Sequence, residues 1–231
     1  QEPIFDSTVP VAPIQEPRLK EEPKIRVGLS APKDGNIQIV SYMDDYRILD
    51  GATVMGVLEK THLAKIRFDE NTGIYSFKGS GVTFETNQYI RLEPVNDPHA
   101  VFEIMNLDRK VSWVRTGSFH QYSGVAEMRR GEVDKELYVV NELFFEDYIS
   151  GIAETSEQAP IEMIKANLVA ARTYAYVAKN KYPFFDVLPS TYDQLYLGYR
   201  SEEVHANLVS AGKATRGMMV GYVSPEAGVG G

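Results

Sequence analysis

Short runs in which apolar residues alternate with polar ones, or in which β-branched residues cluster, follow one another from Lys24 onward. Runs with a period of two are typical of strands, and Gly, Asn and Asp between them indicate turns. We therefore expect strands at residues 25–29, 37–40, 64–68, 74–77, 82–84, 89–92, 101–104 and around Trp113, and a hairpin from 122–129 and 136–140. Residues 54–58 form an apolar patch whose pattern leaves strand and helix open.

Helical spacing of apolar residues replaces this alternation in the second half of the chain. A short amphipathic helix is expected to end near Gly151. A long helix is expected to begin at Pro160, because proline fits the first helical position. Ser201 is expected to cap a third helix over residues 202–214, and residues 218–222 indicate a last strand.

The long helix combines two apolar faces with two cations. Apolar residues lie on the face of Ile164 and Leu168 and also on the opposite face, so we expect burial nearly all round. Lys165 and Arg172 fall together along one edge of this pattern. An unpaired buried charge is costly, so each cation needs an anionic partner or a cleft. The acidic residues considered as partners are Glu142, Glu146 and Asp147.

The order of the elements, strands first and helices later, predicts an α+β fold. In this fold a β-rich amino-terminal part packs with a helical core domain. The expected divisions are a disordered proline-rich linker at 1–23, the β-rich part at 24–119, the core with the long helix at 120–222 and a flexible tail at 223–231.

Charge and residue types exclude several classes of protein. The chain of 231 residues has a net charge of −8, which argues against nucleic acid as a partner, because phosphate binding needs clustered cations. Cysteine is absent, which excludes disulfides and a cysteine nucleophile. The four histidines are scattered, so no metal site is expected. No apolar run is long enough to span a membrane.

Several segments between Tyr122 and Gly217 occur together in one family, in the same order and with similar spacing. They are residues 122–127 (YSGVAE), 139–148 (VVNELFFEDY), 151–154 (GIAE), 165–166 (KA) after Pro160, 170–175 (AARTYA), 194–198 (QLYLG) and 214–217 (ATRG). With these segments the chain resembles the SpoIID-type domain of bacterial stage II sporulation protein D and its relatives. The β-rich residues before them are compatible with the more variable amino-terminal part of that family.

The resemblance implies lytic cleavage of peptidoglycan between N-acetylmuramic acid and N-acetylglucosamine, which leaves 1,6-anhydro ends. The family uses a glutamate in the loop before the helix that carries the AARTYA segment. Glu154 matches this glutamate, because it lies eleven residues before Lys165 as in the family. Glu157 is the rival, because the stretch from Gly151 to Glu154 is two residues shorter than the usual loop of the family.

The resemblance also indicates residues that contact substrate. Lys165 and Arg172 match the lysine and arginine that border the cleft of the family. Gln194 and Tyr196 are expected to bind the sugar, since sugar sites commonly combine an aromatic face with amide hydrogen bonds. Structural roles stay open beside these, namely ion pairs for Lys165 and Arg172 and core or turn positions for Gln194 and Tyr196.

A loop glutamate suits this chemistry. The glycosidic oxygen must receive a proton as it leaves, so the carboxyl has to be protonated near neutral pH, and a partly apolar environment raises its pKa. Hydrolases usually pair this acid with a second carboxylate. A lytic transglycosylase uses one carboxyl twice, first as an acid and then as a base toward the 6-hydroxyl of the muramic acid.

The partner expected from these assignments is the peptidoglycan glycan strand, with a separate wall hydrolase as a further partner and without any cofactor. Because the chain begins with Gln1, we expect that its natural start has been removed. The resemblance implies that the protein is extracytoplasmic, either secreted, in the cell wall or tethered to the membrane through the removed segment.

The family usually continues with an aromatic-Ser-x-Ser-Gly-Gly segment that lines the cleft. The sequence does not contain this segment before Gly231, so we expect either that the chain is cut short or that this branch has lost that wall of the cleft. A non-catalytic peptidoglycan-binding scaffold, or an activator of a wall hydrolase, is therefore the alternative.

Overall fold

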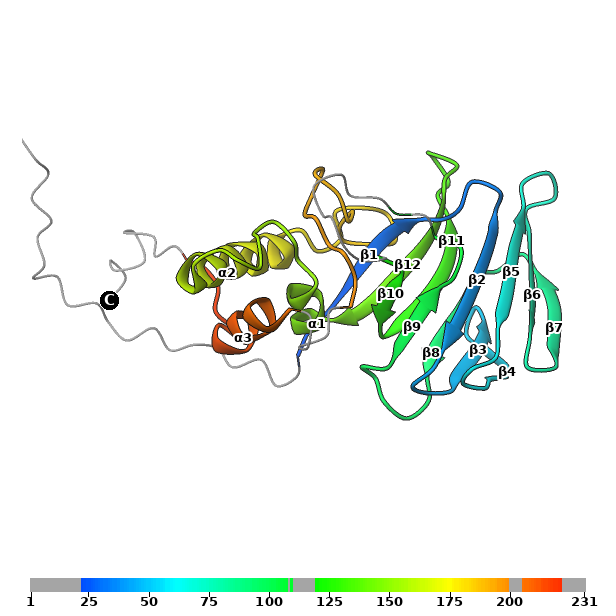
Figure 1. Cartoon of the computed structure of the whole chain (residues 1–231). Coiled ribbons are helices and arrows are strands. Elements are labelled where there is room, and N and C mark those ends of the chain that lie inside the picture. The colour runs from blue at the N-terminus through cyan, green and yellow to red at the C-terminus, as the bar shows by residue number, and fades with distance from the viewer. Residues whose placement is uncertain (1–21, 108, 110–118, 200–204, 222–231) are drawn as a thin grey trace, which may run out of the picture.

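Two antiparallel sheets at one end of the molecule and three helices at the other define the architecture (Figure 1). The computed structural model describes residues 22–107, 109, 119–199 and 205–221. Most of the expected linker and tail, the strand expected around Trp113 and the expected cap Ser201 lie outside these residues. The β-rich character predicted from the sequence is confirmed by the two antiparallel sheets, whereas the expected helical core domain stays a prediction.

Each sheet has six strands, and all neighbours within a sheet are antiparallel. The first sheet has the order β1 (Lys24–Ser30), β12 (Leu137–Phe144), β11 (Val125–Arg130), β8 (Ile90–Pro94), β3 (Tyr46–Asp50) and β4 (Thr53–Leu58). The second has the order β10 (Gln121–Ser123), β9 (Val101–Ile104), β2 (Asn36–Ser41), β5 (Ala64–Asp69), β6 (Ile74–Gly79) and β7 (Val82–Thr86).

Alternation along the strands places one set of side chains between the sheets. Ile48 and Leu92 of the first sheet and Ile66 and Phe77 of the second are fully buried in one continuous apolar cluster. Successive residues of a strand point to opposite faces, so the intervening polar residues line the outer surfaces. The alternation of apolar and polar residues in the sequence therefore arises because one face of each sheet packs against the other sheet.

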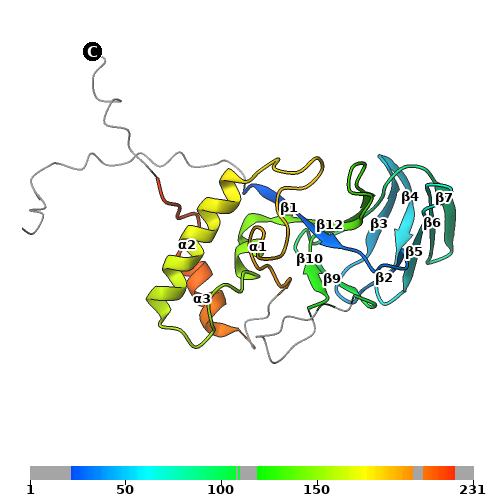
Figure 2. The ribbon, with the colours of Figure 1, turned by 90° about the horizontal axis from the view of Figure 1, so that it is seen from above.

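The three helices are α1 (Phe145–Ser150), α2 (Ile161–Val177) and α3 (Ala206–Ala214). The first continues directly from β12, and the other two pack against each other beside it (Figure 2). Leu168 of α2 and Leu208 of α3 belong to the same apolar cluster as the strands. Strands and helices thus share one core among the described residues.

Gly124 separates two strands where the sequence pattern predicted one continuous strand over 122–129. The chain leaves the second sheet after Ser123 and enters the first at Val125, with φ +84° at Gly124. A Cβ at this position would lie 2.5 Å from the carbonyl oxygen of Glu142. Only glycine fits this backbone and this close contact.

Several other expectations change in the structure. Residues 54–58 fall in β4, and β3 was not expected at all. The last strand expected over residues 218–222 is wrong for 218–221, which run beside α2 without strand structure, and Tyr222 lies outside the described residues. The backbone amide of Val220 donates a hydrogen bond to Thr173 Oγ1 at 2.8 Å. A side chain of α2 thus accepts the hydrogen bond that a neighbouring strand would accept in a sheet.

The prediction that α2 is buried nearly all round is also wrong. Its inner face holds Ile164, Leu168 and Ala175, whereas Met163 is 59% and Val177 78% exposed. The core covers only one side of this helix, and periodicity alone cannot show that an apolar face has no neighbour.

The expected boundary between residues 119 and 120 is crossed by the first sheet. Strand β12 pairs with β1 on one side and with β11 on the other, and β11 pairs with β8. Glu22 and Pro23, expected in the linker, contact α1, since they accept hydrogen bonds from the amides of Glu146 and Phe145.

Candidate functional site

The loop between α1 and α2 places Glu154 beside the segment 195–198. Ala153 donates its amide to the carbonyl of Leu195 at 2.8 Å, and Leu197 donates to the carbonyl of Gly151 at 2.9 Å. A Cβ on Gly151 would lie 2.4 Å from the ring of Tyr196. Glu154 therefore follows directly after a backbone pairing that only glycine at 151 permits.

The surroundings of the Glu154 carboxyl favour its protonated form, as a general acid requires. Its side chain reaches solvent, but the protein atoms packed around it raise its pKa, and the backbone amide of Leu195 offsets only part of this rise. No lysine, arginine or histidine among the described residues forms an ion pair with it. The neutral form is thus favoured relative to an ordinary glutamate.

The buried phenol of Tyr148 senses the charge of Glu154. Burial, and then the negative charge of Glu154, raise the pKa of Tyr148 well above its ordinary value. Its hydroxyl donates to Gln194 Oε1 at 3.0 Å, and Gln194 Nε2 donates to the carbonyl of Ala171 at 3.2 Å. This chain of hydrogen bonds ties the region around Glu154 to α2.

Gln194 and Tyr196, both expected to bind sugar, are buried in this structure. Tyr196 donates its hydroxyl to Asn141 Oδ1 at 3.1 Å, and Asn141 Nδ2 donates in turn to the carbonyls of Ser123 and Val125. The polar atoms of both side chains therefore contact protein groups. A buried tyrosine hydroxyl usually has such a partner.

Arg172 and Lys165 have separate environments, although the sequence places them on one edge of the helix. Arg172 is 1% exposed and forms a two-pronged ion pair with Glu146, through Nε–Oε1 at 3.0 Å and Nη2–Oε2 at 2.8 Å. Its third nitrogen donates to the carbonyl of Met218 at 3.0 Å. Lys165 lies at the surface and pairs with Glu162 at 2.7 Å.

Glu157, the rival of Glu154, holds the start of α3. Its two carboxylate oxygens accept the amides of Asn207 at 2.6 Å and Leu208 at 3.2 Å. A carboxylate at the start of a helix accepts hydrogen bonds from the free N–H groups of the first turn, and its negative charge interacts favourably with the helix dipole. Among the two glutamates, Glu154 is the one whose carboxyl is not used in this way.

Asp193 organises the neighbouring loop and was not expected from the sequence. Its side chain is fully buried and accepts hydrogen bonds from Tyr174, Lys181, Tyr182 and the amide of Leu188. Burial alone would raise its pKa, but these donors outweigh burial and hold the pKa below the ordinary value. The only sequence signal is its position directly before Gln194 in the QLYLG segment.

Comparison with known proteins shows that one stretch of the chain is similar to a known family. Residues 133–222 match the SpoIID family, described as Stage II sporulation protein, and this stretch contains Glu154, α1, α2 and α3. The SpoIID-type resemblance seen in the motifs is confirmed, and it relates the chain to bacterial sporulation and the cell wall.

A curated relative shares part of the sequence. An uncharacterized protein of Brachyspira hyodysenteriae (strain ATCC 49526 / WA1) is 48% identical over 68 residues, which cover 27% of this chain and 18% of the relative. The match thus spans less than a fifth of the length of that protein. No solved structure matches the chain. None of the described helices is long and apolar enough to cross a membrane.

Proposed function

We propose that this protein is an extracytoplasmic SpoIID-like lytic transglycosylase that cleaves peptidoglycan glycan strands, with Glu154 as both general acid and general base. The observation that carries this proposal is the Glu154 carboxyl, which reaches solvent, has a raised pKa and lies within the SpoIID-matched stretch. A raised pKa favours the protonated form of the carboxyl, which is the form that can donate a proton to a leaving glycosidic oxygen.

The reaction needs no water and no second carboxylate. Glu154 donates its proton to the oxygen between the two sugars while the bond from that oxygen to C1 of the muramic acid breaks. The resulting carboxylate then takes the proton from the 6-hydroxyl of the same muramic acid, and that oxygen bonds to C1. The products are a 1,6-anhydro end, a free 4-hydroxyl and a protonated Glu154 ready for the next cycle.

The surrounding residues divide into contact and positioning roles. Lys165 lies on the solvent side of α2, so we assign it a contact with substrate carboxylates or carbonyls. Arg172, Gln194 and Tyr196 would act through the protein instead. They hold α1, α2 and the segment beside Glu154 in place by the hydrogen bonds described above.

Denuded glycan strands, analysed by mass spectrometry for 1,6-anhydro products, test the proposal. We expect release by the natural protein and a loss of about 100-fold or more in Glu154→Gln, the range for removal of a general acid. Glu157→Gln should keep its activity once folded, because that carboxylate binds α3, and the exposed Glu132→Gln serves as a neutral control. Unchanged release by Glu154→Gln would refute the assignment.

One observation favours a second candidate function, a glycan-binding scaffold without catalysis. Gln194 and Tyr196 are buried, so the side chains that the resemblance implied for holding the sugar beside Glu154 do not reach a substrate, which argues against catalysis there. A scaffold would bind the glycan strand through other surface groups, such as Lys165. Pelleting with purified cell walls, in the absence of any anhydro product, would support this second candidate.

A further inference from the structure

Charged residues form a ladder across the outer face of the first sheet, remote from the core between the sheets. Arg26 of β1 lies opposite Glu142 of β12, and Arg91 of β8 lies opposite Glu127 of β11. The contacts are short, with Arg26–Glu142 and Arg26–Glu127 both at 2.7 Å and Arg91–Glu127 and Arg91–Glu142 both at 2.9 Å. Opposite charges on facing strands stabilise such a register.

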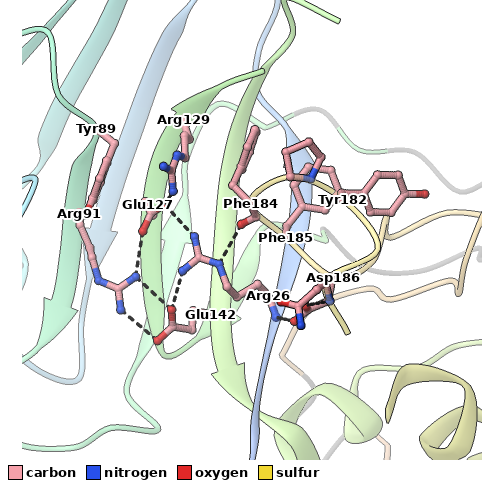
Figure 3. Close-up of a pocket in the computed structure, with 12 residues that line it drawn as sticks. Arg26, Tyr89, Arg91, Glu127, Arg129, Glu142, Tyr182, Phe184, Phe185 and Asp186 are labelled. Carbon is pink, nitrogen blue, oxygen red and sulfur yellow. Dashed lines mark hydrogen bonds and ion pairs between the residues drawn. The ribbon is translucent and has the colours of Figure 1, made fainter. Parts of the chain in front are cut away.

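A loop lies over one side of this ladder and forms one wall of an open cavity of about 440 Å³ (Figure 3). Arg26 fixes the loop, since its Nε donates to the carbonyl of Phe184 and its amide donates to Asp186 Oδ2, both at 2.9 Å. The ring of Phe185 rests on Gly28, where a Cβ would lie 2.8 Å away. Volumes of about 300–1,000 Å³ are typical of small-molecule sites.

Arg129 is the arginine of this group that forms the fewest hydrogen bonds among the described residues. Arg26 and Arg91 each engage all three guanidinium nitrogens, whereas Arg129 makes one contact among the described residues, Nη1 to Glu127 Oε1 at 3.2 Å. Its guanidinium lies 4.8 Å from the ring of Tyr89 and 5.3 Å from that of Phe184. The side chain is 38% exposed and lines the cavity.

This arrangement prepares Arg129 to bind an anion. Two rings hold its guanidinium plane, so little conformational freedom would be lost on binding. Its Nε and Nη2 form the planar donor pair that suits a carboxylate. Of the nearby acids, Glu127 contacts Arg129 through Nη1 alone and is shared with Arg26 and Arg91, and Glu142 pairs with those two arginines, so Nε and Nη2 of Arg129 stay available. The third acid of the cavity, Asp186, accepts the amides of Arg26 and Asn180.

We propose that the cavity beside Arg129 is a second binding site, which takes a carboxylate group of peptidoglycan, with Arg129 as its anchor. This site is separate from the Glu154 loop, and its assignment to peptidoglycan rests on the proposed function. Two sources supply the carboxylate in that polymer. One is the lactyl group of N-acetylmuramic acid in denuded strands, and the other is the carboxyl end of a stem peptide.

Ligand titration by NMR or calorimetry with the full chain tests the site. The probes are N-acetylmuramic acid, N-acetylglucosamine, which has the same ring without the carboxylate, and the dipeptide D-alanyl-D-alanine. We expect binding of at least one carboxylate probe, no binding of N-acetylglucosamine, and a loss of about 10- to 100-fold in affinity in Arg129→Gln. The carboxylate probe that binds more tightly identifies the source.

Arg130→Gln is the matched control. Arg130 is the next residue of β11 and points to the opposite face, where its guanidinium lies 5.1 Å from the ring of Phe68. This variant should bind as the natural protein does, and thermal unfolding should show that both variants fold.

Glu154→Gln separates this proposal from the proposed function, because its carboxylate binding should stay intact while anhydro release is lost. Equal affinity for the neutral and charged sugars, undiminished binding by Arg129→Gln, or no binding of either carboxylate probe would overturn the site.

Discussion

Arg172 is the bulkiest fully buried side chain among the described residues. Its charge stood out in the sequence as a cation on an apolar helix, and Glu146 proves to be its partner. Gly217 also donates its amide to Glu146, and Met218 accepts from Arg172, so one ion pair fixes α1, α2 and the chain after α3. At the residue scale, a single buried charge pair holds together the frame that carries Glu154.

Breaking this pair should destabilise the fold strongly. Arg172→Gln leaves Glu146 without its guanidinium partner in a largely buried place, and we expect a loss of about 3 kcal/mol in the free energy of unfolding. Urea unfolding of Arg172→Gln, Glu146→Gln and the double variant measures the coupling between the two residues. A loss below about 1 kcal/mol for each single variant would contradict this account.

Glu154 gives a pH dependence whose sign follows from its raised pKa. The folded protein binds this proton more tightly than the unfolded chain does, so stability falls as pH rises from the ordinary glutamate value of 4.5 through the folded pKa. Glu154→Gln removes this effect. We expect the variant to have the higher melting temperature at pH 7 and the same melting temperature as the natural protein at pH 3.

Activity should follow the same titration. The protonated acid starts the reaction, so glycan cleavage should decrease as pH rises above the pKa of Glu154. For the stability prediction, equal melting temperatures of the natural protein and Glu154→Gln at both pH 3 and pH 7 would contradict a raised pKa of Glu154.

The segment between α2 and α3 shows how an element without regular structure is fixed. Its residues 182–188 lie along β1, where Gly28 donates its amide to the carbonyl of Val187 at 3.0 Å. Asp193 closes the same segment from the other side through its tyrosine, lysine and amide donors. At the element scale, this loop forms the wall of the cavity at Arg129 and also provides Leu195 beside Glu154.

Gly28→Ala tests this element. The added methyl would meet the ring of Phe185 at 2.8 Å, and overpacking of this kind costs about 1–3 kcal/mol. We expect lower stability and weaker carboxylate binding, because the wall at Phe184 and Phe185 must move. Gly212→Ala in α3 is the control: its nearest contact would be 3.7 Å, and alanine favours a helix, so its melting temperature should not fall.

At the scale of the whole molecule, the main apolar cluster of the described residues spans both sheets and the helices, and the first sheet is built from distant parts of the chain. The first sheet joins β1, near the start of the described chain, to β12, more than a hundred residues later. The SpoIID-matched stretch, residues 133–222, contains β12 but neither of its two neighbours. The family match and the folding unit therefore differ in extent.

A fragment of residues 120–222 should consequently fail to fold alone. It would leave β12 without β1 and β11 without β8, with unpaired backbone groups and an uncovered apolar face. We expect poor dispersion in its NMR spectrum, whereas residues 22–222 should unfold in a single transition detected equally by circular dichroism and fluorescence. An independently folded 120–222 fragment would contradict this prediction.

The sequence by itself predicted most of the elements, the SpoIID-type region and the loop that carries Glu154. Alternation and helical spacing are local properties, so most strands and helices were predicted near their observed bounds, and ordered motifs sufficed to recognise the SpoIID-type region. The local pattern gave a wrong prediction where distant residues determine the path of the chain. At Gly124, one expected strand divides between the two sheets.

Only the tertiary structure decided which groups meet. The partner of Arg172, the burial of Gln194 and Tyr196, and the use of Glu157 at the start of α3 all depend on residues far away in the chain. The cavity at Arg129 combines residues from four strands and a loop. Sequence spacing sets which face of its own element a side chain occupies, but strand register and packing set what lies opposite it, and that contact determines its charge state and its chemistry.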